Sequence, residues 1–181
     1  MRILTLIFFL FFNLANAENL EQKNKLDALF NQLKKVNNSK TAELLEKKIW
    51  KLWSQHPKDH KLTEKLEFGT ELMQYGSYDY ALKVFNNIIN TDPEWSEAWN
   101  KRATVFFLMN QYMKSLDDIE KVLNIEARHF GALSGQARIF IKLQEYEKAI
   151  ISLESALKFY PSFKSGDLIP EIERLIKSES I

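Results

Sequence analysis

The sequence predicts an all-α protein in which helical hairpins stack into a solenoid. Its 181 residues include only 5 Gly and 4 Pro, too few for the turns of a many-stranded sandwich or barrel. Apolar residues recur three and four positions apart, the spacing at which side chains share one face of a helix. The chain also matches itself when it is shifted by 34 residues, and a fixed period of this length is typical of stacked helical repeats.

Residues 1–17 have the pattern of a bacterial signal peptide. A single basic residue precedes a ten-residue apolar run, which is about half the length that crosses a bilayer as a helix. The small residues Ala15 and Ala17 then suit signal peptidase. We therefore expect an exported, periplasmic protein that is cleaved after Ala17, begins at Glu18 and makes no stable insertion into a membrane. The alternative is an uncleaved anchor.

Residues 18–61 predict an N-terminal helical hairpin that acts as a degenerate repeat or capping unit. It departs from the 34-residue period, because Lys47 and Lys51 stand where the period requires apolar residues. Two apolar helical stripes flank a polar break: Leu26, Leu29, Phe30 and Leu33, then Leu45, Ile49, Leu52 and Trp53.

Three units follow in register, at residues 62–95, 96–129 and 130–163. Small residues recur where two helices must approach closely, and large residues recur where they interlock, so each unit is predicted to be a helical hairpin. The recurring positions are Gly69, Ala103 and Ala137; Leu72, Phe106 and Phe140; Tyr78, Tyr112 and Tyr146; Ala81, Ser115 and Ala149; and Pro93, Ala127 and Pro161.

This order of small, aromatic, small and proline positions resembles the tetratricopeptide repeat (TPR) family. The best copy runs from Gly131 through Tyr146 and Ala149 to Pro161. The stretches 99–104 and 128–135 also resemble a group of uncharacterised secreted bacterial TPR proteins. The resemblance implies a right-handed superhelix whose first helices line a concave groove for another protein or peptide.

Residues 164–181 are predicted to form a C-terminal capping helix. Its apolar side can cover the face that the third repeat would otherwise expose to water. The residues on that side are Leu168, Ile169, Ile172, Leu175 and Ile176.

Composition argues against several classes of function. From Glu18 onward the chain has 24 basic and 24 acidic residues, since Arg2 is the only earlier charge, and a nucleic-acid binder normally has a basic excess. The absence of Cys excludes a thiolate nucleophile and a Cys-type zinc site. We expect no cofactor and no metal.

No residue pattern predicts catalysis. His56 and His60 are close in sequence, but Pro57 interrupts the helix that a metal pair would need, so we expect solvated loop residues. His129 begins a helix and has no Ser or carboxylate at a catalytic spacing. Asp117 and Asp118 are neighbours on a helix and point apart, which suits a solvated or ion-paired face better than a glycosidase pair.

The resemblance places partner-binding residues on the first helix of each hairpin. Leu66 and Thr70 stand where the family's carboxylate-clamp version has Lys and Asn, so recognition of a terminal carboxylate is in doubt. The groove residues are Leu66, Thr70 and Met73; Asn100, Thr104 and Phe107; and Ser134, Arg138 and Ile141, with Lys101 adding charge.

Small residues predict a recess within this groove. Gly131, Ser134 and Gly135 share one helix, and we expect a hollow beside Arg138 that takes an acidic or mixed polar partner segment. The alternative is that both glycines only allow close packing of adjacent hairpins.

The leading hypothesis is therefore a non-enzymatic periplasmic adaptor that binds a partner polypeptide in the groove. The alternative is an accessory protein that binds small molecules or peptidoglycan fragments, with Trp50 and Trp53 stacking on sugars. Trp95 and Trp99, like these two, lie on apolar stripes or at hairpin junctions and otherwise suit core packing.

Arg102 stands where the other two repeats place Phe68 and Gln136, at a site of contact between helices. A guanidinium cannot avoid burial by losing its proton, so it requires a partner. Residues equidistant from the turn near Asn110 meet across an antiparallel hairpin, and this predicts a structural pair between Arg102 and Asp118. A ligand carboxylate in the groove is the alternative partner.

Overall fold

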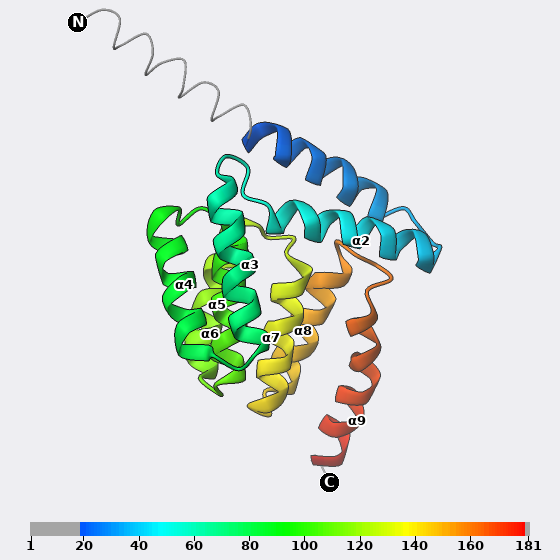
Figure 1. Cartoon of the computed structure of the whole chain (residues 1–181). Helices are drawn as coiled ribbons and strands as arrows, with labels where there is room; N and C mark the ends of the chain where they lie inside the picture. Colours follow the sequence, from blue (N-terminus) through cyan, green and yellow to red (C-terminus); the bar gives the residue numbers. More distant parts are fainter. Residues whose placement is uncertain (1–18, 180–181) are drawn as a thin grey trace, which may run out of the picture.

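A computed structural model describes residues 19–179, and every regular element in this part of the chain is a helix, which confirms the all-α solenoid (Figure 1). The predicted signal peptide lies outside the described residues. None of the described helices is both long and apolar enough to cross a membrane. The elements are an N-terminal helix (residues 19–33), α2 (Ser39–Ser54), α3 (His60–Gln74), α4 (Tyr78–Thr91), α5 (Ser96–Leu108), α6 (Tyr112–Ile125), α7 (Phe130–Lys142), α8 (Tyr146–Leu157), the 3-10 helix η1 (Lys164–Leu168) and α9 (Ile169–Glu179).

Helices α3 to α8 form three antiparallel hairpins with the same turn. Two positions after each first helix ends, a residue lies in the left-handed region: Gly76 (φ 75°), Asn110 (φ 56°) and Gln144 (φ 60°), which lie 34 positions apart. The next residue then donates its backbone N–H to the carbonyl five residues back, and each of these hydrogen bonds is 2.8 Å long. This closes the helix end with a Schellman-type cap, so the chain reverses in the same way three times.

Small residues let the helices of a hairpin approach closely. Ala81, Ala137 and Ala149 are fully buried. At Gly69 a Cβ atom would lie 2.6 Å from the ring of Phe85, so this contact tolerates no side chain. Such interfaces recur with the period and give each hairpin its own buried cluster, and the partly buried Trp99 packs against the clusters of two neighbouring hairpins.

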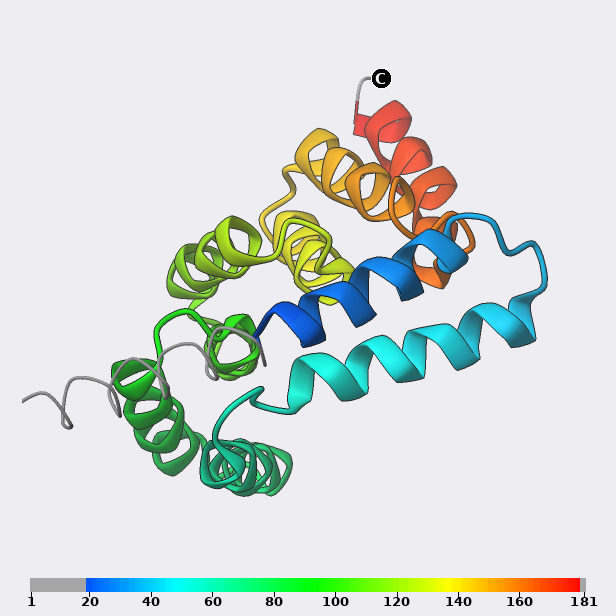
Figure 2. The same cartoon turned by 90° about the horizontal axis from the view of Figure 1, so that it is seen from above.

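The N-terminal hairpin crosses the edge of the solenoid. Figures 1 and 2 show the N-terminal helix and α2 lying side by side across the ends of the repeat helices. Their apolar stripes pack on the third repeat, not on α3 as a cap at the start of the solenoid would. The shared core comprises Leu26, Phe30, Leu33, Ala42, Leu45, Ile49 and Trp53 from the hairpin, and Phe130, Leu133, Ala156 and Tyr160 from the third repeat and the turn that follows it.

Helix α9 covers the other side of the third repeat. Ile172 is 2% exposed and packs with Ala149 and Leu153 of α8, with Ile169 and Ile176 partly buried beside it. This arrangement shields apolar surface that α8 would otherwise expose.

Candidate functional site

The concave side of the solenoid has a cavity of about 390 Å³ between α5 and α7. Helix α2 and the segment that leads into η1 close it at one end. Its walls combine apolar, hydroxyl, amide and charged side chains, which is typical of binding sites. The lining residues are Glu46, Trp50, Asn100, Lys101, Ala103, Thr104, Phe107, Ser115, Ile119, Gly131, Ala132, Ser134, Gly135, Arg138, Phe163 and Ser165.

The two glycines of α7 have different roles. A Cβ atom on Gly131 would lie 2.4 Å from Cη2 of Trp50, so the indole rests directly on the backbone of α7. A Cβ atom on Gly135 would meet only Ile119, at an ordinary 3.7 Å. Close packing therefore requires Gly131, whereas Gly135 leaves room in the cavity.

A buried charged cluster supports the α5 wall. Glu97 is fully buried, its Oε1 lies 3.2 Å from Lys101 Nζ, and its Oε2 accepts from Asn100 Nδ2 at 3.0 Å. Burial alone would raise the pKa of Glu97, but the hydrogen bond from His129 and the charge of Lys101 hold that pKa below its ordinary value. Lys101 therefore faces the cavity with a counterion already beneath it.

His129 joins this cluster to the N-terminal hairpin. Its Nδ1 accepts the backbone N–H of Ala132, so the ring proton lies on Nε2, which donates to Glu97 Oε2 at 3.1 Å. The ring stacks on Trp53 with centroids 4.0 Å apart. His129 is fully buried and helps to position the wall.

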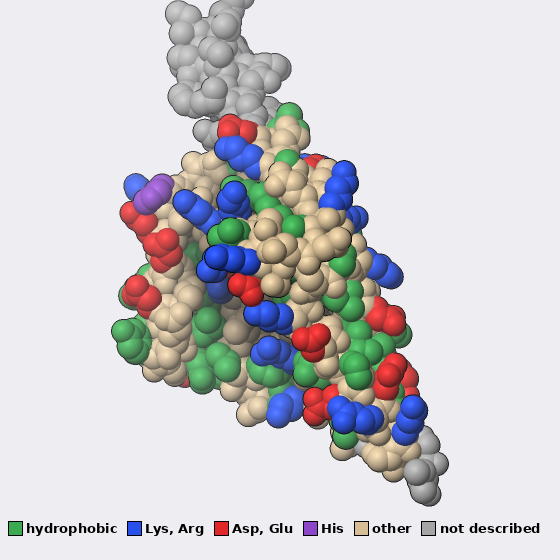
Figure 3. Space-filling view, turned by 90° about the vertical axis from the view of Figure 1, so that its right-hand side faces the viewer, with side chains coloured by type: hydrophobic (Ala, Val, Ile, Leu, Met, Phe, Trp, Pro, Cys, Tyr) green, Lys and Arg blue, Asp and Glu red, His purple; other side chains and the backbone are tan. Residues whose placement is uncertain are grey.

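Arg138 is the exposed cation of the cavity. Within the described part of the chain, it has no hydrogen bond or ion pair with another residue. Figure 3 shows Lys and Arg side chains gathered in a band on the side of the molecule that lies to the right in Figure 1, with acidic side chains among them.

The α2 wall carries an acid. Glu46 Oε1 accepts from Trp50 Nε1 at 3.3 Å, and Oε2 accepts from the Tyr160 hydroxyl at 3.1 Å. Burial and the nearby Glu46 charge raise the pKa of Tyr160, which stays a neutral donor. Glu46, Phe163 and Ser165 were not predicted as site residues, and Trp50 was predicted only for the alternative of a sugar ligand. They lie outside the periodic hairpin helices. Gly131 is the sequence feature that indicates a close neighbour for Trp50, since a glycine permits close approach to the helix backbone.

Several predicted groove residues lie away from the cavity. Leu66 is 2% exposed and belongs to the core of the first repeat, so its prediction as a groove residue was wrong. Met73 packs partly against the same core, and the Thr70 hydroxyl donates to the Leu66 carbonyl. Ile141 packs against the core beneath α9. The predicted residues that the structure brings together at the cavity are Asn100, Lys101, Thr104, Phe107, Ser134 and Arg138.

Arg102 lies outside the cavity, between neighbouring hairpins. Its Nε and Nη2 donate to the two oxygens of Asp118 at 2.8 and 2.6 Å, and Nη1 donates to Asn86 at 2.6 Å. Its guanidinium also lies 4.8 Å from the ring centroid of Trp99. Burial raises the pKa of Asp118, although Arg102 acts in the opposite direction. Asp117 is exposed, so the neighbouring carboxylates do point apart.

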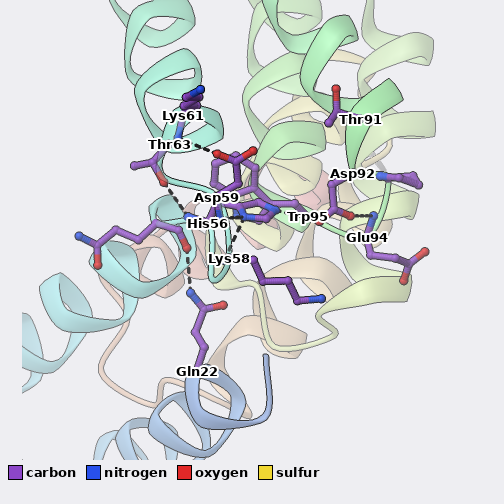
Figure 4. A network of polar contacts seen from close by, with 12 residues as sticks. Gln22, His56, Lys58, Asp59, Lys61, Thr63, Thr91, Asp92, Glu94 and Trp95 are labelled. Atoms are coloured by element: carbon purple, nitrogen blue, oxygen red, sulfur yellow. Dashed lines mark hydrogen bonds and ion pairs between the residues drawn. The ribbon is translucent and has the colours of Figure 1, made fainter. Parts of the chain in front are cut away.

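His56 is not the solvated loop residue that the sequence suggested. Its side chain is 4% exposed, and Nε2 lies 2.8 Å from Asp92 Oδ2 (Figure 4). The backbone N–H of Asp59 donates to its Nδ1, and its ring packs edge-on against Trp95. The side chain of His60 is 84% exposed, as expected. No cluster of three or more potential metal ligands occurs within residues 19–179.

A second cavity, of about 500 Å³, lies on the other side of the N-terminal hairpin. Its principal cation, Arg128, is already paired with Glu126 and Asp27. Its wall also includes Asn19, next to residues that are not described. The concave cavity is therefore the stronger candidate.

Comparisons with known proteins agree with this architecture. A TPR repeat-containing protein of Rhizobium etli is 34% identical over 140 residues, which cover 77% of this chain and 68% of that protein. No protein-family model matches the chain.

Solved structures show the same fold. The first TPR of Spaghetti (RPAP3), bound to the HSP90 peptide SRMEEVD, has a TM-score of 0.61 and 19% identity, covering 65% of this chain and 94% of that one. The Yersinia enterocolitica type III secretion chaperone SycD, in complex with a peptide of the translocator YopD, has a TM-score of 0.61 and 16% identity, covering 68% of this chain and 97% of that one.

Proposed function

This chain belongs to the tetratricopeptide repeat family, and from that premise we propose that it is a non-enzymatic adaptor that binds a partner polypeptide in its concave cavity. One observation carries the proposal: the unpaired Arg138 guanidinium lies at a cavity that also offers Lys101, hydroxyl groups and apolar walls. A partner segment with an anionic group would satisfy Arg138. A groove contact of this kind has an affinity on the order of micromolar.

The described hydroxyl groups of the cavity favour binding over catalysis. Ser115 donates to the Ala103 carbonyl and Thr104 to the Asn100 carbonyl, and Ser134 and Ser165 share a hydrogen bond of 2.9 Å; none of these hydroxyls contacts a base in the described part of the chain. None of these arrangements provides the neighbouring base that activates a serine nucleophile. The peptides bound to Spaghetti and SycD support a polypeptide ligand by analogy.

The location proposed for this activity is the bacterial periplasm. It rests on the leader pattern of residues 1–17, so N-terminal sequencing of the exported protein should find Glu18 as its first residue. An intact Met1 on membrane-bound protein would instead indicate that residues 1–17 stay uncleaved and anchor the protein to the membrane.

Photo-cross-linking in the native host tests the binding proposal. A benzoylphenylalanine at position 104, which lines the cavity, should give a discrete cross-linked product. Arg138→Glu should reduce its yield by roughly tenfold, since the substitution puts an acid opposite the partner's anionic group. The matched control is Arg174→Glu, which changes the charge of an exposed arginine on α9 equally. Equal yields in both variants would refute the proposed site.

A small-molecule ligand is the second candidate, and the size of the cavity favours it. A volume of about 390 Å³ lies within the range of small-ligand pockets, and Trp50 could stack on a sugar of a peptidoglycan fragment. The predicted role of Trp53 in stacking was wrong, because this residue is 4% exposed and covered by His129. Saturable binding of cell-wall fragments that Trp50→Ala abolishes would favour this candidate.

A further inference from the structure

Besides Arg138 and Lys101, the cavity has a third charged group, Glu46, at the end opposite to Arg138 along α7. Trp50 rests on Gly131 near the start of α7. Arg138 follows seven residues later, which is two helical turns or about 10 Å along the axis. Glu46 is hydrogen-bonded to Trp50 and therefore lies at the Gly131 end. The cavity therefore has a carboxylate at the Gly131 end and a guanidinium at the other end, with Lys101 already paired with Glu97 in the α5 wall.

Glu46 has no cationic partner within 4 Å in the described part of the chain. Each of its oxygens accepts one neutral donor, Trp50 Nε1 or the Tyr160 hydroxyl, and each has capacity for a second. Glu43, one turn earlier on the same helix, is paired with Lys164 at 2.9 Å. Of these two α2 acids, Glu46 lines the cavity and Glu43 does not.

Aromatic rings surround this carboxylate. Trp50 and Phe163 both line the cavity, and Phe163 stacks on Tyr160 with centroids 5.2 Å apart. An acid beside half-buried aromatic rings that line a cavity suits an ammonium or guanidinium group, which gains both a charged hydrogen bond and contact with the rings. An acidic group would instead be repelled by Glu46, and a neutral group would leave the charge of Glu46 without a counterion.

We propose that the cavity binds a segment that carries both charges, with a cation at Glu46 between Trp50 and Phe163 and a carboxylate at Arg138. The proposal rests on the proposed function and narrows its ligand class from acidic segments to segments of mixed charge. The cation can come from a Lys or Arg side chain or from a free amino terminus.

Short peptides can test this arrangement. The probe is a blocked peptide with one Lys and one Glu, and a series with zero to three Ala between them covers the separation of about 10 Å. NMR titration follows the Trp50 indole N–H, because this group donates to Glu46. At the best spacing, replacing Lys by norleucine should weaken binding by roughly tenfold, as should replacing Glu by Gln. A peptide with a free amino terminus in place of the Lys side chain distinguishes the two sources of the cation.

Variants of α2 assign the effect to one residue. Glu46→Gln should remove the advantage of Lys over norleucine, measured as the ratio of the two dissociation constants within that variant, so that a change in overall affinity does not affect the comparison. Glu43→Gln removes the same charge one turn away and should change nothing at this site. Equal affinities of wild type for the Lys and norleucine peptides would overturn the proposal.

Two results separate this inference from the function on which it rests. If none of the peptides binds while the cross-link at position 104 persists and depends on Arg138, the mixed-charge ligand is wrong and the adaptor function stands. If the cross-link does not depend on Arg138, the proposed function fails regardless of the peptides.

Discussion

The repeat hairpins and the N-terminal hairpin hold together in different ways. In the repeats, polar contacts join near neighbours: Arg102 and Asp118 are 16 positions apart. The N-terminal hairpin contacts the far end of the chain, since Tyr160 lies 114 positions from Glu46 and Lys164 lies 121 positions from Glu43. The solenoid is thus a series of local interfaces. The N-terminal hairpin (residues 19–54) instead makes long-range contacts with the third repeat and the segment after it, and we call this hairpin with its contacts the clasp.

The candidate site lies at the boundary between these two regions. The repeats supply Asn100, Lys101 and Arg138, and the clasp supplies Glu46 and Trp50. Changes that loosen the clasp should therefore affect both stability and binding, whereas changes within a repeat core should affect stability alone.

The largest expected effect comes from removing a buried Phe, either from the core shared by the clasp and the third repeat or from the core of the first repeat. Phe130 and Phe85 are both fully buried, but Phe130 contacts hairpin aromatics such as Trp53, whereas Phe85 packs within the first repeat and its neighbour. Alanine at either position should cost about 3–5 kcal/mol of unfolding free energy, measured by urea denaturation. Hydrogen exchange should accelerate in residues 19–54 for Phe130→Ala only. Equal exchange in both variants would show that the clasp is not an independent contact.

A smaller effect distinguishes the two glycines of α7. Gly131→Ala places a methyl group against Trp50 and should destabilise the protein by about 1–3 kcal/mol, because the indole must shift. Gly135→Ala is the matched control. Its methyl group meets only Ile119 at 3.7 Å, so the higher helix propensity of Ala should stabilise the protein by up to about 1 kcal/mol. Thermal unfolding measures both, and a neutral Gly131→Ala would mean that Trp50 packs loosely.

The repeat architecture could be predicted from sequence because its contacts follow the period. Knowing one hairpin indicates what the next must bury, so the small residues at Gly69, Ala103 and Ala137 predict close helix contacts. The Arg102–Asp118 geometry also follows from local antiparallel packing. The prediction at Leu66 failed because a position matched to the family does not by itself show which residue of a helix turn faces the core and which faces the groove.

The clasp could not be placed from sequence. Its apolar stripes predicted a hairpin, but a stripe does not identify the surface that covers it. Phe130 resembles any other core residue, and Glu46 and Trp50 have no counterpart in the period. His56 was misjudged for the same reason, since its partner Asp92 lies 36 positions away and only folding brings them together.

The smallest expected effect compares one ion pair from each region by double-mutant cycles. Arg102 and Asp118 form two hydrogen bonds, and their side chains are 18% and 5% exposed. Arg128 and Asp27 form one hydrogen bond between the second repeat and the N-terminal helix, and the Asp27 side chain is 46% exposed. Coupling in the repeat pair should exceed the roughly 0.2–1 kcal/mol of exposed pairs, and coupling in the clasp pair should stay within that range.

The difference has a structural reason beyond exposure. Removing Asp27 leaves Arg128 paired with Glu126, whose oxygens accept from its Nε and Nη2 at 2.8 and 2.7 Å. Removing Arg102 leaves Asp118 buried and facing no cation, and the cost of an unpaired buried charge adds to the lost contact. Equal coupling in both pairs, measured by urea denaturation of the single and double alanine variants, would show that charge holds the clasp as firmly as it holds the repeats. Zero coupling at Arg102, together with loss of the cross-link at position 104 in Arg102→Ala, would instead assign this arginine to the partner.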